Sequence, residues 1–484
     1  MKMKKALSLL AALSLMASFT ACSNTSSPAA TDPVDDNSPA DSAPVDSEEE
    51  TPSESTAEET GDKKELRVWA FTDEVPGMVQ KYLDTHDLGD KYVMKESIIA
   101  TTDGAYQPAL DAALAGDEVD MYAAEAAFIL KYSQGEAAKY AATYEDLGID
   151  VDAKIKEAEI AQYTVDIGTN PDGKVVGLGY QATGGAFIYR RSIAKDAFGS
   201  DDPDTVKSEI GPGWDKFFEA ADKLKAKGYG IVSGDGDIWH AVENSSDTGW
   251  IKDGKLHIDP KREEFLDLSK KLMDNDYHND TQDWQEAWFA DMAGTGKKGV
   301  LGFFGPAWLI NYTIAKNCGR EVDEATGEVK AEGTWGDWAV CEPPIGFFWG
   351  GTWVLGANAS PNKDAVGEII EWITLDTSEE GLQYMWANGT YNPDNATKDA
   401  VASNVVMKKS DGKIDFLSGQ NMFDIFVPAN EFANGKNLTP YDEDINSLWR
   451  DQVRQYAHGE KDRDTALADF KQAVSDKLDI EAAE

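Results

Sequence analysis

Short β-prone segments alternate with helical segments near the start of the folded chain, and this order constrains the fold more than any other feature. Residues 65–71 (ELRVWAF), 92–99 and 119–122 have the length and apolar character of strands. Helical spacing of apolar residues follows the first strand, over residues 78–83, and the second, over residues 106–115. A strand–helix–strand–helix order predicts an α/β fold with a parallel sheet.

Polar and aromatic side chains stand where two of these strands end. Trp69 closes the first strand, and the loop that follows contains Asp73 and Glu74. Glu125 follows the third strand. Ligands of parallel α/β sheets collect at the carboxyl ends of the strands, so we predict that these four residues contribute to a ligand site.

The length and charge of the chain limit its architecture and its partners. It has 484 residues, whereas a single core stops growing at roughly 250 to 300 residues. We therefore expect two hinged lobes, one from residues 63–180 with about 345–388 and one from about 181–344 with 389–484. With 88 acidic and 45 basic residues the net charge is −43, which repels nucleic acid, so we exclude nucleic acid as a partner.

The N-terminal residues have the pattern of an export signal. Three lysines precede an apolar run over residues 6–19, and the run is too short to span a bilayer as a stable helix. The ending FTAC resembles a bacterial lipobox, although Phe19 replaces the usual Leu-like residue. We predict a signal peptide over residues 1–21 and lipidation of Cys22; the alternative is ordinary cleavage beside a stray cysteine. Residues 22–62, rich in Ser, Pro and acidic side chains, then form a disordered linker.

One stretch, FFWGGTWVLGAN (residues 347–358), sets large aromatics beside two glycines before an apolar strand. Aromatic faces next to a mobile backbone are typical of a ligand cleft, and Trp349 and Trp353 are therefore candidate binding residues. The alternative is that both indoles fill core.

Similar combinations of aromatic and polar residues recur elsewhere. Tyr180 and Gln181 lie in a glycine-rich crossing between the lobes, although Tyr180 is equally suited to a structural hinge. Further candidates follow other predicted strands or turns: Asp237, Trp239, Trp308 and Asn421. In contrast, helical spacing assigns the aromatics of residues 214–218 to core.

The remaining motifs point to no cofactor and no metal. GTGKKG (residues 294–299) lacks two required positions of a phosphate-binding loop, and neither a nucleophile elbow nor HExxH occurs. Cys318 and Cys341 are an even pair in an exported protein, which predicts one disulfide; two free buried thiols are the alternative. Two cysteines without a nearby histidine pair fall short of a zinc site.

Several segments, taken in order along the chain, resemble one family. They are VWAFTDE, VDMYAAEAAF, GYQATGGAFIYRRSIAKDAFG, GPGWDKFFEAADKLKAKGY, FFGPAWLINY, GDWAVCEPP and FFWGGTW. Together with the lipobox they resemble the family 1 extracellular solute-binding proteins of carbohydrate ABC transporters, relatives of maltose-binding protein.

The resemblance implies a two-lobed periplasmic-binding-protein fold of type II that closes around a sugar. It also implies a monomer without catalytic activity, tethered by its lipid at the outer face of the cytoplasmic membrane, that delivers a carbohydrate ligand to ABC permease subunits. Two other functions remain open: a secreted glycoside hydrolase, which needs two carboxylates about 5 to 9.5 Å apart, and a sugar-sensing surface ectodomain without a permease.

Overall fold

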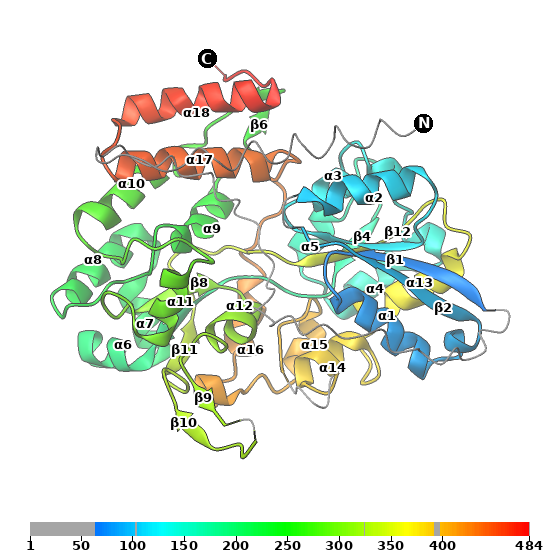
Figure 1. Cartoon of the computed structure of the whole chain (residues 1–484), viewed down its shortest axis with the longest axis horizontal. Helices are drawn as coiled ribbons and strands as arrows, with labels where there is room; N and C mark the ends of the chain where they lie inside the picture. Colours follow the sequence, from blue (N-terminus) through cyan, green and yellow to red (C-terminus); the bar gives the residue numbers. More distant parts are fainter. Residues whose placement is uncertain (1–62, 102–103, 324, 392–396, 484) are drawn as a thin grey trace, which may run out of the picture. The chain divides into compact units, whose positions relative to one another are not determined.

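The larger sheet of the computed structural model has five strands in the order β2-β1-β3-β12-β4 (Figure 1). β1 (Lys64–Ala70) runs parallel to β2 (Tyr92–Ile98) and to β3 (Met121–Glu125), as the sequence predicted. β12 (Thr352–Gly356) is antiparallel to both of its neighbours, β3 and β4 (Gly177–Gly179). Segments far apart in the chain therefore build this sheet, which we call the sheet of the first lobe.

The structure describes residues 63–101, 104–323, 325–391 and 397–483. The predicted signal peptide, Cys22 and the linker over residues 22–62 lie outside these residues.

Helices cover the first-lobe sheet because each presents one apolar face to it. In α1 (Glu74–Thr85) the buried residues include Val75, Met78 and Val79, at the spacing of one helical face. In α13 (Lys363–Thr374) the buried face includes Ile369, Ile370 and Ile373. Both helices contribute to one continuous core with alternate residues of β1.

The sheet of the second lobe has three antiparallel strands. β5 (Ala186–Arg190) lies between β8 (Gly302–Gly305) and β11 (Trp338–Cys341). Side chains of β5 alternate between the two faces: Phe187 and Tyr189 join one hydrophobic cluster, whereas Ile188 joins the other. This sheet is therefore buried on both faces.

Most helices of the second lobe come from the middle of the chain. They are α6 (Arg191–Phe198), α7 (Pro203–Ile210), α8 (Gly213–Lys225), α9 (Gly236–Ser245), α10 (Pro260–Asp274), α11 (Glu286–Ala293) and α12 (Ala307–Leu309). Phe217 and Phe218 of α8 are buried in the core, as their helical spacing predicted.

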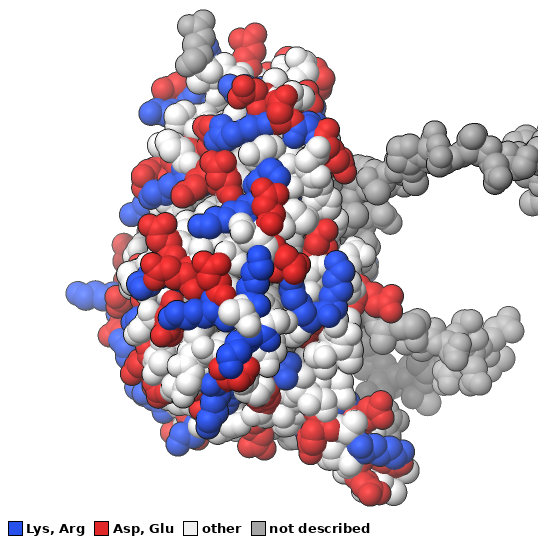
Figure 2. Space-filling view, turned by 90° about the vertical axis from the view of Figure 1, so that its left-hand side faces the viewer, with Lys and Arg blue, Asp and Glu red and all other residues white. Residues whose placement is uncertain are grey.

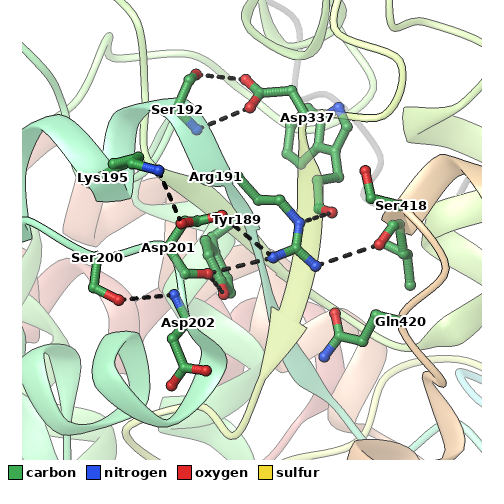
Figure 3. Close-up of polar contacts among 12 residues, drawn as sticks. Tyr189, Arg191, Ser192, Lys195, Ser200, Asp201, Asp202, Asp337, Ser418 and Gln420 are labelled. Atoms are coloured by element: carbon green, nitrogen blue, oxygen red, sulfur yellow. Dashed lines mark hydrogen bonds and ion pairs between the residues drawn. The ribbon is translucent and has the colours of Figure 1, made fainter.

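Arg191 ties three parts of this lobe together (Figure 3). Its guanidinium donates to the backbone carbonyls of Trp338 (3.0 Å), Asp201 (3.4 Å) and Leu417 (3.3 Å). Asp337 accepts from the backbone N–H of Ser192 (2.8 Å) and thereby holds the start of α6 beside β11. Residues 190–192 (RRS) therefore have a structural role, because they join β5, α6 and β11.

Two C-terminal helices, α17 (Asp442–Ala457) and α18 (Arg463–Leu478), lie side by side, and α17 packs on α10 (Figure 1). The turn between them contains Gly459 at φ +77° and ends at Asp462, whose side chain caps α18 by accepting from Thr465 N (2.8 Å). This arrangement brings the arginines of α17 next to α9 and to the segment before α11.

The remaining elements are short. The α-helices are α2 (Tyr106–Ala115), α3 (Ile129–Ser133), α4 (Val151–Ala158), α5 (Gln162–Ile167), α14 (Leu382–Asn388), α15 (Asn404–Lys409) and α16 (Phe423–Ala429). Two hairpins pair β6 (Ile251–Lys252) with β7 (Lys255–Leu256) and β9 (Glu321–Val322) with β10 (Val329–Ala331). The other short helices are the π-helix η5 (Ile310–Ile314) and the 3₁₀ helices η1 (Asp87–Asp90), η3 (Ala138–Tyr140), η4 (Glu145–Leu147) and η6 (Asp415–Leu417).

The outer face of the second lobe mixes both signs of charge. Figure 2 shows acidic and basic side chains interspersed over it. Exposed ion pairs of this lobe, such as Lys216–Glu219 of α8 (2.7 Å), each contribute little stability. This face therefore offers no large patch of one sign. Within the described ranges, no helix combines the length and apolarity needed to cross a bilayer.

The predicted disulfide is wrong, because Cys318 and Cys341 are both free and buried. Cys318 belongs to one hydrophobic cluster and donates to the carbonyl of Ala315 (3.1 Å), whereas Cys341 belongs to the other. The carbonyl of Cys318 pairs with Thr334 N (2.7 Å), ahead of β11, and Cys341 lies at the far end of that strand. The extended strand separates the two thiols.

Candidate functional site

Three half-buried indoles and an imidazole form a group that we call the tryptophan cluster: Trp284, Trp308, Trp349 and His240. Trp308 and Trp349 meet edge to face, with ring centroids 5.0 Å apart. Trp284 lies parallel to Trp308 (6.2 Å, 8° between planes) and edge-on to Trp349 (6.0 Å). His240 stacks on Trp349 at 4.4 Å. These rings keep part of their faces accessible, unlike the indoles of the cores.

The segment that presents Trp349 is fixed by its backbone. Gly350 and Gly351 have φ +72° and +114°, which glycine adopts without the clash that a Cβ causes. Trp349 N donates to the carbonyl of Thr183 (3.1 Å), and the Thr183 hydroxyl donates to the carbonyl of Gly350 (2.9 Å). Trp308 Nε1 donates to the carbonyl of Trp349 (3.2 Å). The indole of Trp308 is therefore hydrogen-bonded directly to the backbone of Trp349.

The Glu125 carboxylate of the first lobe lies near the tryptophan cluster, beside Gly350 and close to the Trp308 indole. A Cβ placed on Gly350 would lie 3.5 Å from the Trp308 indole and 3.7 Å from Glu125 Oε1. Glu125 is the last residue of β3, and its Oε2 accepts from Ala127 N (2.7 Å). Burial, together with the charge of Glu443, raises the pKa of Glu125 to about 7, although the hydrogen bond from Ala127 N–H opposes this rise. An acceptor from the first lobe and an indole from the second thus face the same glycine.

A second polar group lies at the end of β1. The Glu74 carboxylate accepts from the hydroxyls of Tyr180 and, at 3.1 Å, of Tyr312, which belongs to η5. Burial raises the pKa of Glu74, which these two hydroxyl bonds oppose. Nearby Asp399 is buried, and burial, together with the charge of Glu74, raises its pKa to about 8. Trp69 is half-buried against the core and Asp73 is exposed. Hydrogen bonds thus connect two of the predicted site residues, Glu74 and Tyr180, with Tyr312 of η5.

Two predicted stacking residues lie in the cores instead. Trp239 and Trp353 are each only 1% exposed. Trp239 packs on Phe265 with centroids 4.9 Å apart, and Trp353 Nε1 donates to the carbonyl of Thr164 (2.9 Å). Neither indole has a face available to a ligand, so both predictions are wrong.

The other predicted polar residues have local partners. Asp237 accepts from the backbone N–H groups of Ser233 (2.8 Å) and Gly234 (2.9 Å) and from Trp288 Nε1 (3.1 Å), and it is buried. Asn421 bonds within its own turn, to Asp424. Gln181 is buried where the chain crosses between the sheets. The structure therefore gives Asp237 a structural role and leaves Gln181 and Asn421 as untested predictions.

No sequence pattern singled out Trp284, His240 or Tyr312 as a site residue. His240 directly follows Trp239, and helix α9 turns the tryptophan into the core and the histidine toward Trp349. Trp284 precedes Trp288 by four residues, a spacing that suggests core, and its φ of +64° cannot be read from sequence. The aromatic-rich segment FFGPAWLINY contained Tyr312 and was the one signal available.

The chemistry of these residues is that of recognition. Indole faces pack on apolar C–H surfaces, and carboxylates accept hydrogen bonds from hydroxyl groups. In the described part of the chain, no group of His, Cys, Asp and Glu is arranged to hold a metal ion. The arrangement is therefore suited to a polar organic solute with apolar faces.

Solved structures share this fold over nearly their whole length. A crystal structure described as an extracellular solute-binding protein of family 1 has 18% sequence identity and a TM-score of 0.68, over 85% of this chain and 99% of that one. The galacto-N-biose-/lacto-N-biose I-binding protein of the ABC transporter from Bifidobacterium longum, in complex with lacto-N-biose, gives 15% and 0.61 over 88% and 100%. The sugar-binding protein MalE of Xanthomonas citri gives 14% and 0.61 over 85% and 97%. These similarities confirm the predicted two-lobed α/β fold of the type II binding proteins.

The family model for bacterial extracellular solute-binding proteins matches residues 85–412, well over half of the chain. The protein belongs to this family, as the sequence resemblance indicated. No curated protein sequence matches the chain.

Proposed function

We propose that this protein captures a sugar or oligosaccharide between its lobes and delivers it to the permease of an ABC importer. The observation that carries the proposal is the meeting of Trp308, Trp349 and Glu125 around Gly350. A sugar has apolar C–H faces for the indoles and hydroxyls for the carboxylate. The solved relatives include an ABC-transporter-associated binding protein from B. animalis subsp. lactis in complex with beta-1,6-galactobiose, at 21% identity.

The mechanism requires binding without covalent chemistry. The first lobe supplies Glu125, Glu74 and Trp349, and the second supplies Trp284, Trp308, His240 and Tyr312. A solute that contacts both lobes favours the closed arrangement by the extra contacts it makes there, and the permease recognises that arrangement. Differential affinity for the closed state is sufficient, and no catalytic residue is needed.

The remaining parts of the proposal come from the sequence. We assign the first lobe to residues 63–180 with about 345–388, and the second to about 181–344 with 389–484. The chain is exported as a monomer and held at the outer face of the membrane by lipidated Cys22, with residues 22–62 as a spacer. The family, described as extracellular, supports export.

The test is calorimetric and fluorescence titration with a panel of mono- and oligosaccharides, using the wild-type protein, Trp349→Ala and Trp335→Ala. Trp335 is also half-buried, but it packs on Phe416 instead of on the cluster. We expect at least one sugar to bind, and Trp349→Ala to weaken it by about ten- to a hundredfold, as for other stacking aromatics that supply about 1–3 kcal/mol. Trp335→Ala should leave the affinity unchanged.

Two results would contradict the proposal. One is that no sugar changes the heat or the tryptophan fluorescence of the wild-type protein. The other is that both alanine variants lose stability equally and keep the same affinity. Incubation of the bound oligosaccharide with the protein, followed by analysis of reducing ends, separates binding from hydrolysis.

A further inference from the structure

Trp284 is held in an unusual backbone conformation. Its φ is +64°, in the left-handed region, and it is the only aromatic residue with a positive φ in the part of the chain that the structure describes. Bulky L-residues rarely adopt this region, and such residues persist only where their surroundings determine them. The surroundings of Trp284 therefore have to supply the constraint.

The constraint begins at the preceding residue. Asp283 is buried, with 5% of its side chain exposed, and its Oδ2 lies 2.9 Å from Arg450 Nη2 of α17. The pair packs against the backbone of Gly236 at the start of α9. A Cβ at that position would lie 2.4 and 2.5 Å from the Asp283 oxygens and 2.7 Å from Arg450. Only glycine leaves room there for the pair.

Further contacts tie the same segment to α17. Asp280 lies 3.1 Å from His458 Nε2, and Arg454 reaches Asp235 (3.3 Å) at the N-terminal end of α9. Helix α9 also places His240 on the face of Trp349. Two sides of the tryptophan cluster thus depend on one network of charges between α9, α17 and residues 280–283.

We propose that Asp283 and Arg450 are positioning residues, which hold Trp284 parallel to Trp308 and so set the affinity of the cluster for its ligand without touching that ligand. This proposal rests on the proposed function for the ligand, but the position of Trp284 can be measured separately. Asp283 acts through the backbone of the next residue, and Arg450 acts through Asp283.

The first experiment needs no ligand. The protein is labelled with 5-fluorotryptophan, and the ¹⁹F resonance of Trp284 is assigned by its loss in Trp284→Phe. In Asp283→Asn and Arg450→Lys we expect the Trp284 resonance to shift or broaden, whereas that of Trp353, buried in the core of the first lobe, stays in place. The control is Asp337→Asn, which breaks another half-buried ion pair of the second lobe, Arg190–Asp337 (2.8 Å).

The second experiment is a double-mutant cycle with the tightest sugar of the panel. We expect Asp283→Asn to weaken binding by about tenfold, within the range for coupled neighbours, and Asp337→Asn to have no effect. In a Trp284→Ala background, Asp283→Asn should cause little further loss, because its effect acts through that indole. Gly236→Ala provides an independent disturbance of the same pair if Asp283→Asn fails to fold.

An unchanged Trp284 resonance in the folded variants overturns the positioning role. Additive losses in the cycle overturn the route through Trp284. If the wild-type protein binds no sugar, the proposed function fails, while the ¹⁹F result still decides whether the ion pair positions the indole.

Discussion

The substitution Gly350→Ala tests whether the ligand occupies the space between the two lobes at the tryptophan cluster. The added Cβ would lie 3.5 Å from Trp308 and 3.7 Å from Glu125, both ordinary contact distances, so the side chains need not move. The backbone has φ +72°, where an L-residue costs roughly 1–2 kcal/mol relative to glycine. The protein should therefore fold with a modest loss of stability and with a methyl group in the site.

The matched control is Gly228→Ala. Gly228 has φ +85°, and its added Cβ would meet nothing within 4 Å. Both variants should lose about 1–2 kcal/mol in urea unfolding, because the backbone strain is similar. Only Gly350→Ala should also weaken sugar binding in calorimetric titration, by about tenfold if one ring contact or hydrogen bond worth about 1.4 kcal/mol is lost. Equal affinity of Gly350→Ala, Gly228→Ala and the wild-type protein would refute the placement of the ligand at this glycine.

Two further predictions concern protonation and redox state. The folded pKa of Glu125 is about 7 instead of 4.5, so the folded protein holds this proton up to a higher pH than the unfolded chain. The contribution of Glu125 to the free energy of unfolding should fall as the pH rises from about 4.5 to 7. Glu125→Gln should therefore lose less stability than the wild-type protein between pH 5 and pH 8, and an equal loss for the two proteins in urea unfolding would refute the raised pKa of Glu125. Because Cys318 and Cys341 are free, a reductant should leave the melting temperature unchanged, and thiol titration in denaturant should detect both; a melting temperature lowered by dithiothreitol would mean that they form a disulfide.

Local pattern was sufficient for the first two strands and for α2 of the first lobe. The predicted strands over residues 65–71 and 92–99 correspond to β1 and β2, and the helical spacing over residues 106–115 corresponds to α2. These features depend on residues close together in the chain, so periodicity reveals them. β12 was recognised as a strand, but its antiparallel place between β3 and β4 depends on partners far away in sequence.

Local sequence pattern was not sufficient for the residues of the candidate site. Trp239 closes a predicted glycine-rich turn and Trp308 follows a predicted strand, yet Trp239 fills a core and Trp308 joins the cluster. Trp239 and His240 are neighbours on α9, but Trp239 points into the core and His240 points toward Trp349. The sequence alone does not show which of the two neighbours faces the core, and for this reason His240 was missed. Cys318 and Cys341 were paired by number alone, and the extended strand β11 separates them.

By itself, the order of segments along the sequence determined the α/β class and the solute-binding family. Hydrophobic spacing and turn residues act over a few positions, and they survive in any single chain. The tertiary structure decided which indoles keep an exposed face, which carboxylate meets them, and how Asp283 and Arg450 hold Trp284. Those outcomes depend on which helix faces which sheet, a relation between distant segments that no local pattern contains.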